Sequence, residues 1–290
     1  MIKKVNYKAW LLLLPALSLL IAFTHWPTIK SIYRSVTWAR SDMAPSQFVG
    51  MENYAMMLDD PVFWKVMENN FWYAVGTVPT SIALAIIMAL WVNSKIRFTG
   101  LLRLAYFTPT ILPMITVANI WLFFYSPNIG LFDQLLQLVG IDGPNWLGDP
   151  DLALSSLIVM TVWKEAGFFM IFYLAALQLL SVELYEAAKV EGASAWRTFR
   201  KITFPLLMPT TLFVLINALL NAFKLVDHLF ILTKGGPNNA SNLLLYYIYE
   251  TAFSFLDSYY AATLTVVMLV ILAIIAFVQI FFFDRKIHYR

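Results

Sequence analysis

Apolar residues gather in six long segments that alternate with shorter polar stretches along the chain. A helix needs about 20 mostly apolar residues to cross the hydrocarbon core of a bilayer, where its backbone hydrogen bonds must close internally. Each of the six segments is long enough. The pattern therefore predicts an all-α integral membrane protein with six transmembrane helices, at about 9–33, 71–92, 104–125, 152–180, 206–232 and 259–283.

Lysine and arginine are distributed unequally between the two sets of connections. Thirteen lie in the N-terminus, the second-to-third and fourth-to-fifth connections and the C-terminus, whereas four lie in the opposite set. Basic loops are retained in the cytoplasm. We therefore expect both termini to be cytoplasmic, with residues 1–8 as the N-terminal tail and 9–290 as a single transmembrane domain.

The composition narrows the function. Apolar residues make up 60% of the chain and charged residues 13%, against about 25% charged residues in a soluble domain. The absence of cysteine and three scattered histidines leave no metal or catalytic site to predict. The sequence also lacks the phosphate loop of an ATPase. An active transporter of this size must therefore draw on an ion gradient or on another subunit.

The fourth-to-fifth connection, 181–205, has a pattern of its own. Ser181 can cap a helix that Gly192 interrupts, and Ser194 can cap a second, basic amphipathic helix that Pro205 ends. Composition alone allows two interpretations of this segment. It can lie on anionic lipid as an interfacial helix, or it can dock on another protein.

The sequence of this connection resembles the EAA loop of binding-protein-dependent ABC importer permeases. The residues that carry the resemblance are Glu186, Ala187, Ala188, Gly192, Ala193, Trp196, Phe199, Ile202, Pro205 and Pro209. Glu191 and Phe204 depart from the commoner Asp and Leu of the family. Thr233-Lys-Gly-Gly-Pro237 and the segment 48–54 are also similar to the carbohydrate-uptake subset, above all to the maltose-type and glycerol-3-phosphate-type first permease subunit.

The resemblance implies a type I ABC importer permease-like fold with a cytoplasmic coupling-helix loop, in the bacterial cytoplasmic (inner) membrane. The residues implied to couple to the ATPase are Glu186, Ala187, Ala188, Gly192, Ala193 and Arg197. The implied partners are a second homologous permease subunit in a heterodimer, two cytoplasmic ATPase subunits, an extracytoplasmic substrate-binding protein and membrane lipid, with no nucleic acid. This chain would bind no cofactor, since ATP and Mg belong to the ATPase.

Polar side chains inside the spans are candidates for a substrate pathway, because a charge facing lipid at mid-bilayer costs about 2.5–3.5 kcal/mol. Helical spacing groups them on one face of the fourth span and one of the fifth. The candidates are Thr161, Lys164, Glu165, Phe168, Asn217, Asn221, Lys224 and Asp227, together with Asn119 of a third span that its prolines should kink. Alternatively, the charged residues form ion pairs at the subunit interface or with each other, and the asparagines form hydrogen bonds between packed helices.

The favoured function is that of a non-enzymatic permease subunit, forming half of the translocation pathway of an ATP-driven importer for a sugar or related polyol. The same importer type for glycerol-3-phosphate or a glycerophosphodiester is an alternative. An ion-coupled secondary transporter is an alternative of another class, for which Glu165 and Asp227 are the available intramembrane carboxylates and no internal repeat is visible.

Overall fold

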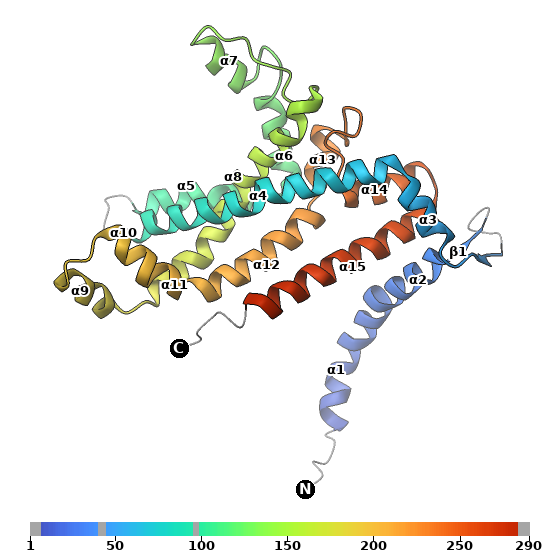
Figure 1. Ribbon diagram of the computed structural model, residues 1–290, viewed down its shortest axis with the longest axis horizontal. Coiled ribbons are helices and arrows are strands. Elements are labelled where there is room, and N and C mark those ends of the chain that lie inside the picture. Colours follow the sequence, from blue (N-terminus) through green and yellow to red (C-terminus); the bar gives the residue numbers. More distant parts are fainter. Residues whose placement is uncertain (1–6, 40–44, 95–98, 284–290) are drawn as a thin grey trace. The chain divides into compact units, whose positions relative to one another are not determined.

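The computed structural model describes residues 7–39, 45–94 and 99–283 (Figure 1). Some of the basic residues used to predict the orientation therefore lie outside the described residues, namely Lys3, Lys4, Arg40, Lys95, Arg97, Arg285, Lys286 and Arg290. The described part is helical except for its connections and one short antiparallel hairpin, in which β1 (Thr37–Trp38) pairs with β2 (Gln47–Phe48).

The helices follow one another along the whole described chain. Their bounds are α1 Tyr7–Leu20, α2 Trp26–Ser35, α3 Glu52–Asp59, α4 Pro61–Asn93, α5 Thr99–Ile111, α6 Met114–Phe124, α7 Leu131–Gln137, α8 Pro150–Gln178, α9 Val182–Val190, α10 Ala195–Thr198, α11 Phe204–Leu206, α12 Met208–Lys224, α13 Asp227–Leu232, α14 Leu244–Tyr249 and α15 Ser258–Phe283. Three π-helical turns join them, η1 Ile21–His25, η2 Phe199–Thr203 and η3 Glu250–Ser254.

Five helical stretches of the described chain are long and apolar enough to cross a membrane, Trp10–Ser35, Pro61–Asn93, Pro150–Gln178, Met208–Leu232 and Ser258–Gln279. The helices α5 and α6 pass the same test as a pair, but they are bent by 103° at the break between them. Taken as one span, this pair brings the number to six. The all-α membrane fold is thus confirmed, and the kink expected in the third span is a sharp bend.

The second span begins about ten residues earlier than the hydropathy pattern predicts. Its helix α4 starts at Pro61, where proline suits the first turn because it has no N–H to leave unpaired. The side chain of Asp60 accepts a hydrogen bond from the Val62 N–H at 2.8 Å. The first turns of α4 carry Lys65 and Glu68, so an apolar window does not detect them.

The described residues divide into two compact units, which are treated separately here. The first unit comprises Met1–Phe63 and Ile248–Val270, and the second comprises Trp64–Tyr247 and Ile271–Arg290. Both α4 and α15 begin in the first unit and continue into the second.

In the first unit, buried side chains hold the hairpin and α3 in place. The amide of Asn53 donates hydrogen bonds to the carbonyls of Ser35 at 3.0 Å and Thr37 at 2.9 Å. The hydroxyl of Tyr260, in the first turn of α15, donates to Asp60 Oδ2 at 2.6 Å. The bond between Tyr260 and Asp60 joins segments 200 residues apart in sequence.

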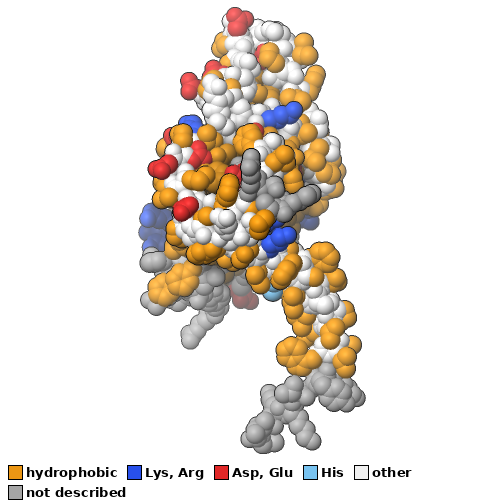
Figure 2. Space-filling model, turned by 90° about the vertical axis from the view of Figure 1, so that its right-hand side faces the viewer, with side chains coloured by type: hydrophobic (Ala, Val, Ile, Leu, Met, Phe, Trp, Pro, Cys, Tyr) orange, Lys and Arg blue, Asp and Glu red, His pale blue; other side chains and the backbone are white. Residues whose placement is uncertain are grey.

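The first span, also in this unit, exposes its side chains. None of its apolar window is buried within the chain, and Figure 2 shows hydrophobic side chains along its length. Internal packing therefore does not explain the apolar character of this helix. A bilayer around it does.

The second unit is packed around α8, in which 61% of the apolar window is buried. Two glycines permit close approach of its neighbours, as is common between helices in membranes. A Cβ at Gly76 of α4 would lie 2.8 Å from Ile158 of α8, and a Cβ at Gly167 of α8 would overlap the carbonyl oxygen of Tyr106 in α5. The backbones of α5 and α8 thus touch at Gly167.

Substitution of Gly167 by alanine tests this contact. We expect Gly167→Ala to lower the free energy of unfolding by about 1–3 kcal/mol, because the added methyl group meets a backbone atom that cannot rotate away. The measurement is thermal unfolding of the full chain in detergent. Gly100→Ala in α5 is the control, since a Cβ there meets no atom within 4 Å. Equal losses in the two variants would contradict the close crossing.

Candidate functional site

The second unit brings the two predicted polar faces together. The side-chain amide of Asn221 in α12 donates a hydrogen bond to Glu165 Oε2 in α8 at 2.8 Å. Glu165 is 8% exposed, so its carboxylate lies inside the helix bundle, where it needs such a donor. The fourth and fifth spans are therefore joined through a polar contact that both sequence patterns contain.

A third helix, α4, contributes to the same cluster. The hydroxyl of Tyr73 lies 2.7 Å from Thr161 Oγ1 of α8 and 3.1 Å from His228 Nε2 of α13. Tyr73 and His228 have no exposed surface, and their rings stack with centroids 5.9 Å apart. Tyr73 thus connects three helices, α4, α8 and α13, at a buried point.

Next to this contact lies a small polar cavity. Hydroxyl and amide groups line it, with apolar side chains between them; the polar residues are Thr77, Ser81, Thr161, Glu165 and Asn221. Its volume of about 10 Å³ is that of a single water molecule. The buried hydroxyl of Ser81 has no hydrogen-bond partner within the described chain, which is consistent with a hydrated cavity.

Sequence reasoning missed the contribution of α4. Tyr73, Thr77 and Ser81 follow one another at intervals of four residues, so they lie on one face of the helix. The spacing of a tyrosine and two small hydroxyl residues along one face of the second span is the sequence signal for this contribution.

Five predicted pathway residues lie away from the cavity. Asn119 and Asn217 each donate to a carbonyl of their own helix at 2.8 Å, and Phe168 is 39% exposed. Lys224 and Asp227 are exposed. Lys224 and Asp227 form no ion pair with each other within the part of the chain that the structure describes. The alternative in which these two charges neutralise each other is therefore not observed there. For these five residues, the pathway assignment stays a prediction.

Lys164 has a different environment from its neighbour Glu165. Its Nζ donates hydrogen bonds to the carbonyl oxygens of Leu112 at 2.7 Å and Pro109 at 3.2 Å. Leu112 lies in the break between α5 and α6, and Pro109 lies in the last turn of α5. Lys164 is not among the residues that line the polar cavity.

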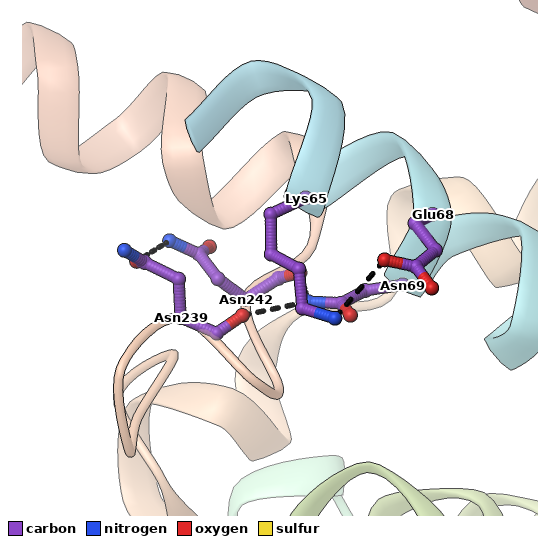
Figure 3. A network of polar contacts seen from close by, with 5 residues as sticks. All are labelled: Lys65, Glu68, Asn69, Asn239 and Asn242. Carbon is purple, nitrogen blue, oxygen red and sulfur yellow. Dashed lines mark hydrogen bonds and ion pairs between the residues drawn. The ribbon is translucent and has the colours of Figure 1, made fainter. Parts of the chain in front are cut away.

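At the opposite end of α4 from the fourth-to-fifth connection, Asn69 and Asn70 bond to the connection that follows α13; Figure 3 shows the contacts of Asn69. The amide of Asn69 donates to the carbonyls of Asn239 at 2.7 Å and Asn242 at 3.0 Å. The side chain of Asn70 accepts from the Leu244 N–H at 2.6 Å. The second span thus holds residues 239–244, which directly follow the Gly-Gly-Pro segment that resembles the carbohydrate-uptake subset.

The fourth-to-fifth connection forms the predicted helix, bend and second helix. Gly192 separates α9 from α10 with a φ of +71°, a conformation that favours glycine. Ser194 caps α10 by accepting from the Arg197 N–H at 3.3 Å. Of the predicted coupling residues, Ala188 is buried and Ala193 half-buried, whereas Glu186, Ala187, Gly192 and Arg197 are exposed.

One predicted helix boundary in this connection is confirmed and one is wrong. Ser181 stands at the N-cap of α9 as predicted, but its side chain makes no capping hydrogen bond, and its hydroxyl donates to the side chain of Glu183 at 3.1 Å. Pro205 does not end the second helix, which continues through Leu206. The π-helical turn η2 immediately before α11 widens the hydrogen-bond pattern there, so that a proline can follow without breaking the helix.

The fourth-to-fifth connection meets the span bundle across a groove and through a side-chain hydrogen bond. A groove of about 690 Å³, lined mainly by apolar side chains, separates α9 and α10 from the end of α4. The hydroxyls of Tyr185 in α9 and Thr203 in η2 lie 3.2 Å apart. This hydrogen bond fixes α9 against the segment that leads into α12.

Residues 81–289 match the family described as binding-protein-dependent transport system inner membrane component. The lactose transport system permease protein LacF of Rhizobium radiobacter is 34% identical over 95% of this chain and 94% of its own length. The sulfoquinovosyl glycerol transport system permease protein SmoG of Agrobacterium fabrum is 33% identical over 90% and 85%. A chain of a bacterial alginate ABC transporter, crystallised with an alginate pentasaccharide-bound periplasmic protein, has the same fold, with a TM-score of 0.82, 23% identity and 97% and 93% coverage.

Removal of one hydroxyl tests the buried contact between α4, α8 and α13. We expect Tyr73→Phe to destabilise the chain by about 1–2 kcal/mol, because it leaves the polar atoms of Thr161 and His228 without this partner. Thermal unfolding measures the loss. Tyr125→Phe is the matched control, since that hydroxyl makes one hydrogen bond, to the Ser156 carbonyl at 2.8 Å. A loss no greater than in the control would argue against the three-helix contact.

Proposed function

The chain belongs to the family of binding-protein-dependent transport system inner membrane components, and from this premise we propose how its parts divide the work of an ABC importer. It is a multi-pass, non-enzymatic permease subunit, and ATP hydrolysis belongs to a separate subunit. The proposal concerns the substrate, the partners and the orientation. We propose that the chain forms half of a translocation pathway for a neutral sugar or related polyol.

The polar cavity is the observation that carries the substrate proposal. Its polar residues, Thr77, Ser81, Thr161, Glu165 and Asn221, offer hydroxyl, amide and carboxylate groups. Such groups exchange hydrogen bonds with the hydroxyls of a polyol as water does. Among the described residues that line the cavity there is no lysine or arginine. A phosphate would favour a basic residue there, so the cavity supports a neutral polyol over glycerol-3-phosphate or a glycerophosphodiester.

The cavity holds one water-sized volume, so substrate can enter only after α4, α8 and α12 separate. In this proposal, the alternation between closed and open arrangements passes through the Asn221–Glu165 and Tyr73–Thr161–His228 contacts. These contacts break and form again in each cycle. An external binding protein delivers the substrate, and affinity selection resides largely in that protein.

The coupling connection carries the second part of the proposal. Its exposed residues Glu186, Ala187 and Gly192 surround the bend between α9 and α10. Small side chains permit the close backbone approach that a protein cleft requires. We assign this surface to an ATPase subunit, with ATP and Mg held by that subunit. The assembly would contain two ATPases and a second, homologous permease, with both termini of this chain cytoplasmic in the bacterial inner membrane.

Gly192 provides the test of coupling. We expect Gly192→Asp to abolish ATP-driven uptake by the assembled importer, because a charged side chain then projects from the docking surface. Assembly should persist, since a Cβ at Gly192 meets no atom within 4 Å. Uptake and co-purification of the ATPase are the measurements. Gly140→Asp is the matched control, with a φ of +75° and equally open surroundings. Uptake by the Gly192 variant at the level of this control would count against the docking surface.

The substrate class is tested with radiolabelled lactose and radiolabelled glycerol-3-phosphate, supplied separately to proteoliposomes that contain the assembled importer and its binding protein. We expect uptake of the neutral sugar. At limiting sugar concentration, Asn221→Ala should reduce the rate of uptake about tenfold, which corresponds to a loss of about 1.4 kcal/mol of binding free energy. Asn217→Ala, one turn earlier, should change uptake less than about twofold, because the Asn217 amide bonds its own helix. Uptake of glycerol-3-phosphate alone would favour the anionic alternative.

A further inference from the structure

The break between α5 and α6 leaves two carbonyl groups without helical partners. In a regular helix the carbonyl of Pro109 would accept from the N–H of residue 113, but Pro113 has no N–H. Leu112 lies between the two helices, outside the hydrogen-bond ladder of either one. No water is available in the hydrocarbon core, so such carbonyls must be satisfied by the protein itself.

Lys164 of α8 supplies the missing donors. Its Nζ donates to Leu112 at 2.7 Å and to Pro109 at 3.2 Å. A cationic side chain is also suited to the C-terminal end of a helix, where the helix dipole is negative. One side chain thus satisfies two of the carbonyls that the break leaves without helical partners.

The position of Lys164 matches the close crossing of α5 and α8. Lys164 and Gly167 lie one turn apart on α8, and their contacts Pro109 and Tyr106 lie one turn apart on α5. The two helices therefore meet at two successive points. At one point the backbones touch, and at the other the lysine fixes the end of α5.

We propose that Lys164 is a positioning residue that holds the 103° bend of the third span and, through α6, places α13. The helix α6 packs on α13, which carries His228 of the buried contact with Tyr73. Lys164 therefore acts on the closed arrangement from outside the polar cavity. This role differs from the substrate contact that the sequence pattern predicts for the residue.

A pair of substitutions separates the two roles. Lys164→Met removes the donors, and we expect the unfolding temperature of the full chain to fall by about 3 °C or more, because two carbonyls lose their partner. Adding Pro113→Ala restores an N–H that can pair with the Pro109 carbonyl inside a continuous helix. The double variant should therefore recover the unfolding temperature while its bend opens.

Spin labels measure the bend. The chain has no cysteine, so labels on Leu101→Cys and Phe123→Cys, both at exposed positions of α5 and α6, are unique in it. We expect a broader distance distribution in Lys164→Met and a longer mean distance in Lys164→Met with Pro113→Ala, as the helices straighten. Lys164→Arg keeps the donors and should retain the short distance. Lys65→Met controls for loss of a lysine on the exposed end of α4.

Two results would overturn the proposal. The first is an unfolding temperature and label distance in Lys164→Met equal to those of the unaltered chain. In that case, a raised apparent KM for lactose uptake would return Lys164 to the substrate pathway. The second is additivity, in which Pro113→Ala lowers the unfolding temperature as much in the Lys164→Met chain as in the unaltered one. Failure of these tests leaves the coupling and substrate experiments unaffected, since those concern other residues.

Discussion

A backbone polar group that leaves the helical ladder inside a bilayer must find another partner within the protein, and the irregular points of this chain follow from that requirement. Among the prolines inside helical stretches of the described chain, Pro27 and Pro205 each follow a π-helical turn, η1 and η2 respectively. The wider turn redirects the hydrogen bonds around a residue that cannot donate. At Pro113 the chain bends sharply instead, and Lys164 satisfies the carbonyls that the break releases.

The same requirement explains the pairing of polar side chains within the spans. Glu165 lies against Asn221, and His228 lies against Tyr73. Each pair joins different helices, so a polar side chain inside the bundle both satisfies its own hydrogen bonds and connects the elements that must separate for transport. The number of such contacts is small. An arrangement held by a few hydrogen bonds can be opened by the modest differences in free energy that binding of a partner supplies.

Features that depend on a short local stretch of sequence were predictable. Features that depend on contacts between residues far apart in the sequence were not. Apolar runs gave the spans, and Gly192 and Ser194 gave the bend and cap of the coupling connection. Tyr73 and the partner atoms of Lys164 were missed for physical reasons. A tyrosine among apolar residues has the pattern of ordinary core, and the acceptors of Lys164 are backbone carbonyls, which no side-chain pattern records.

The asparagines at the beginning of α4 have a consequence for the order in which the chain matures. Asn69 and Asn70 bond to backbone atoms about 170 residues later in the sequence. During synthesis the second span is therefore complete long before its partners exist. These hydrogen bonds can form only after the three spans between α4 and the connection that follows α13 have been made.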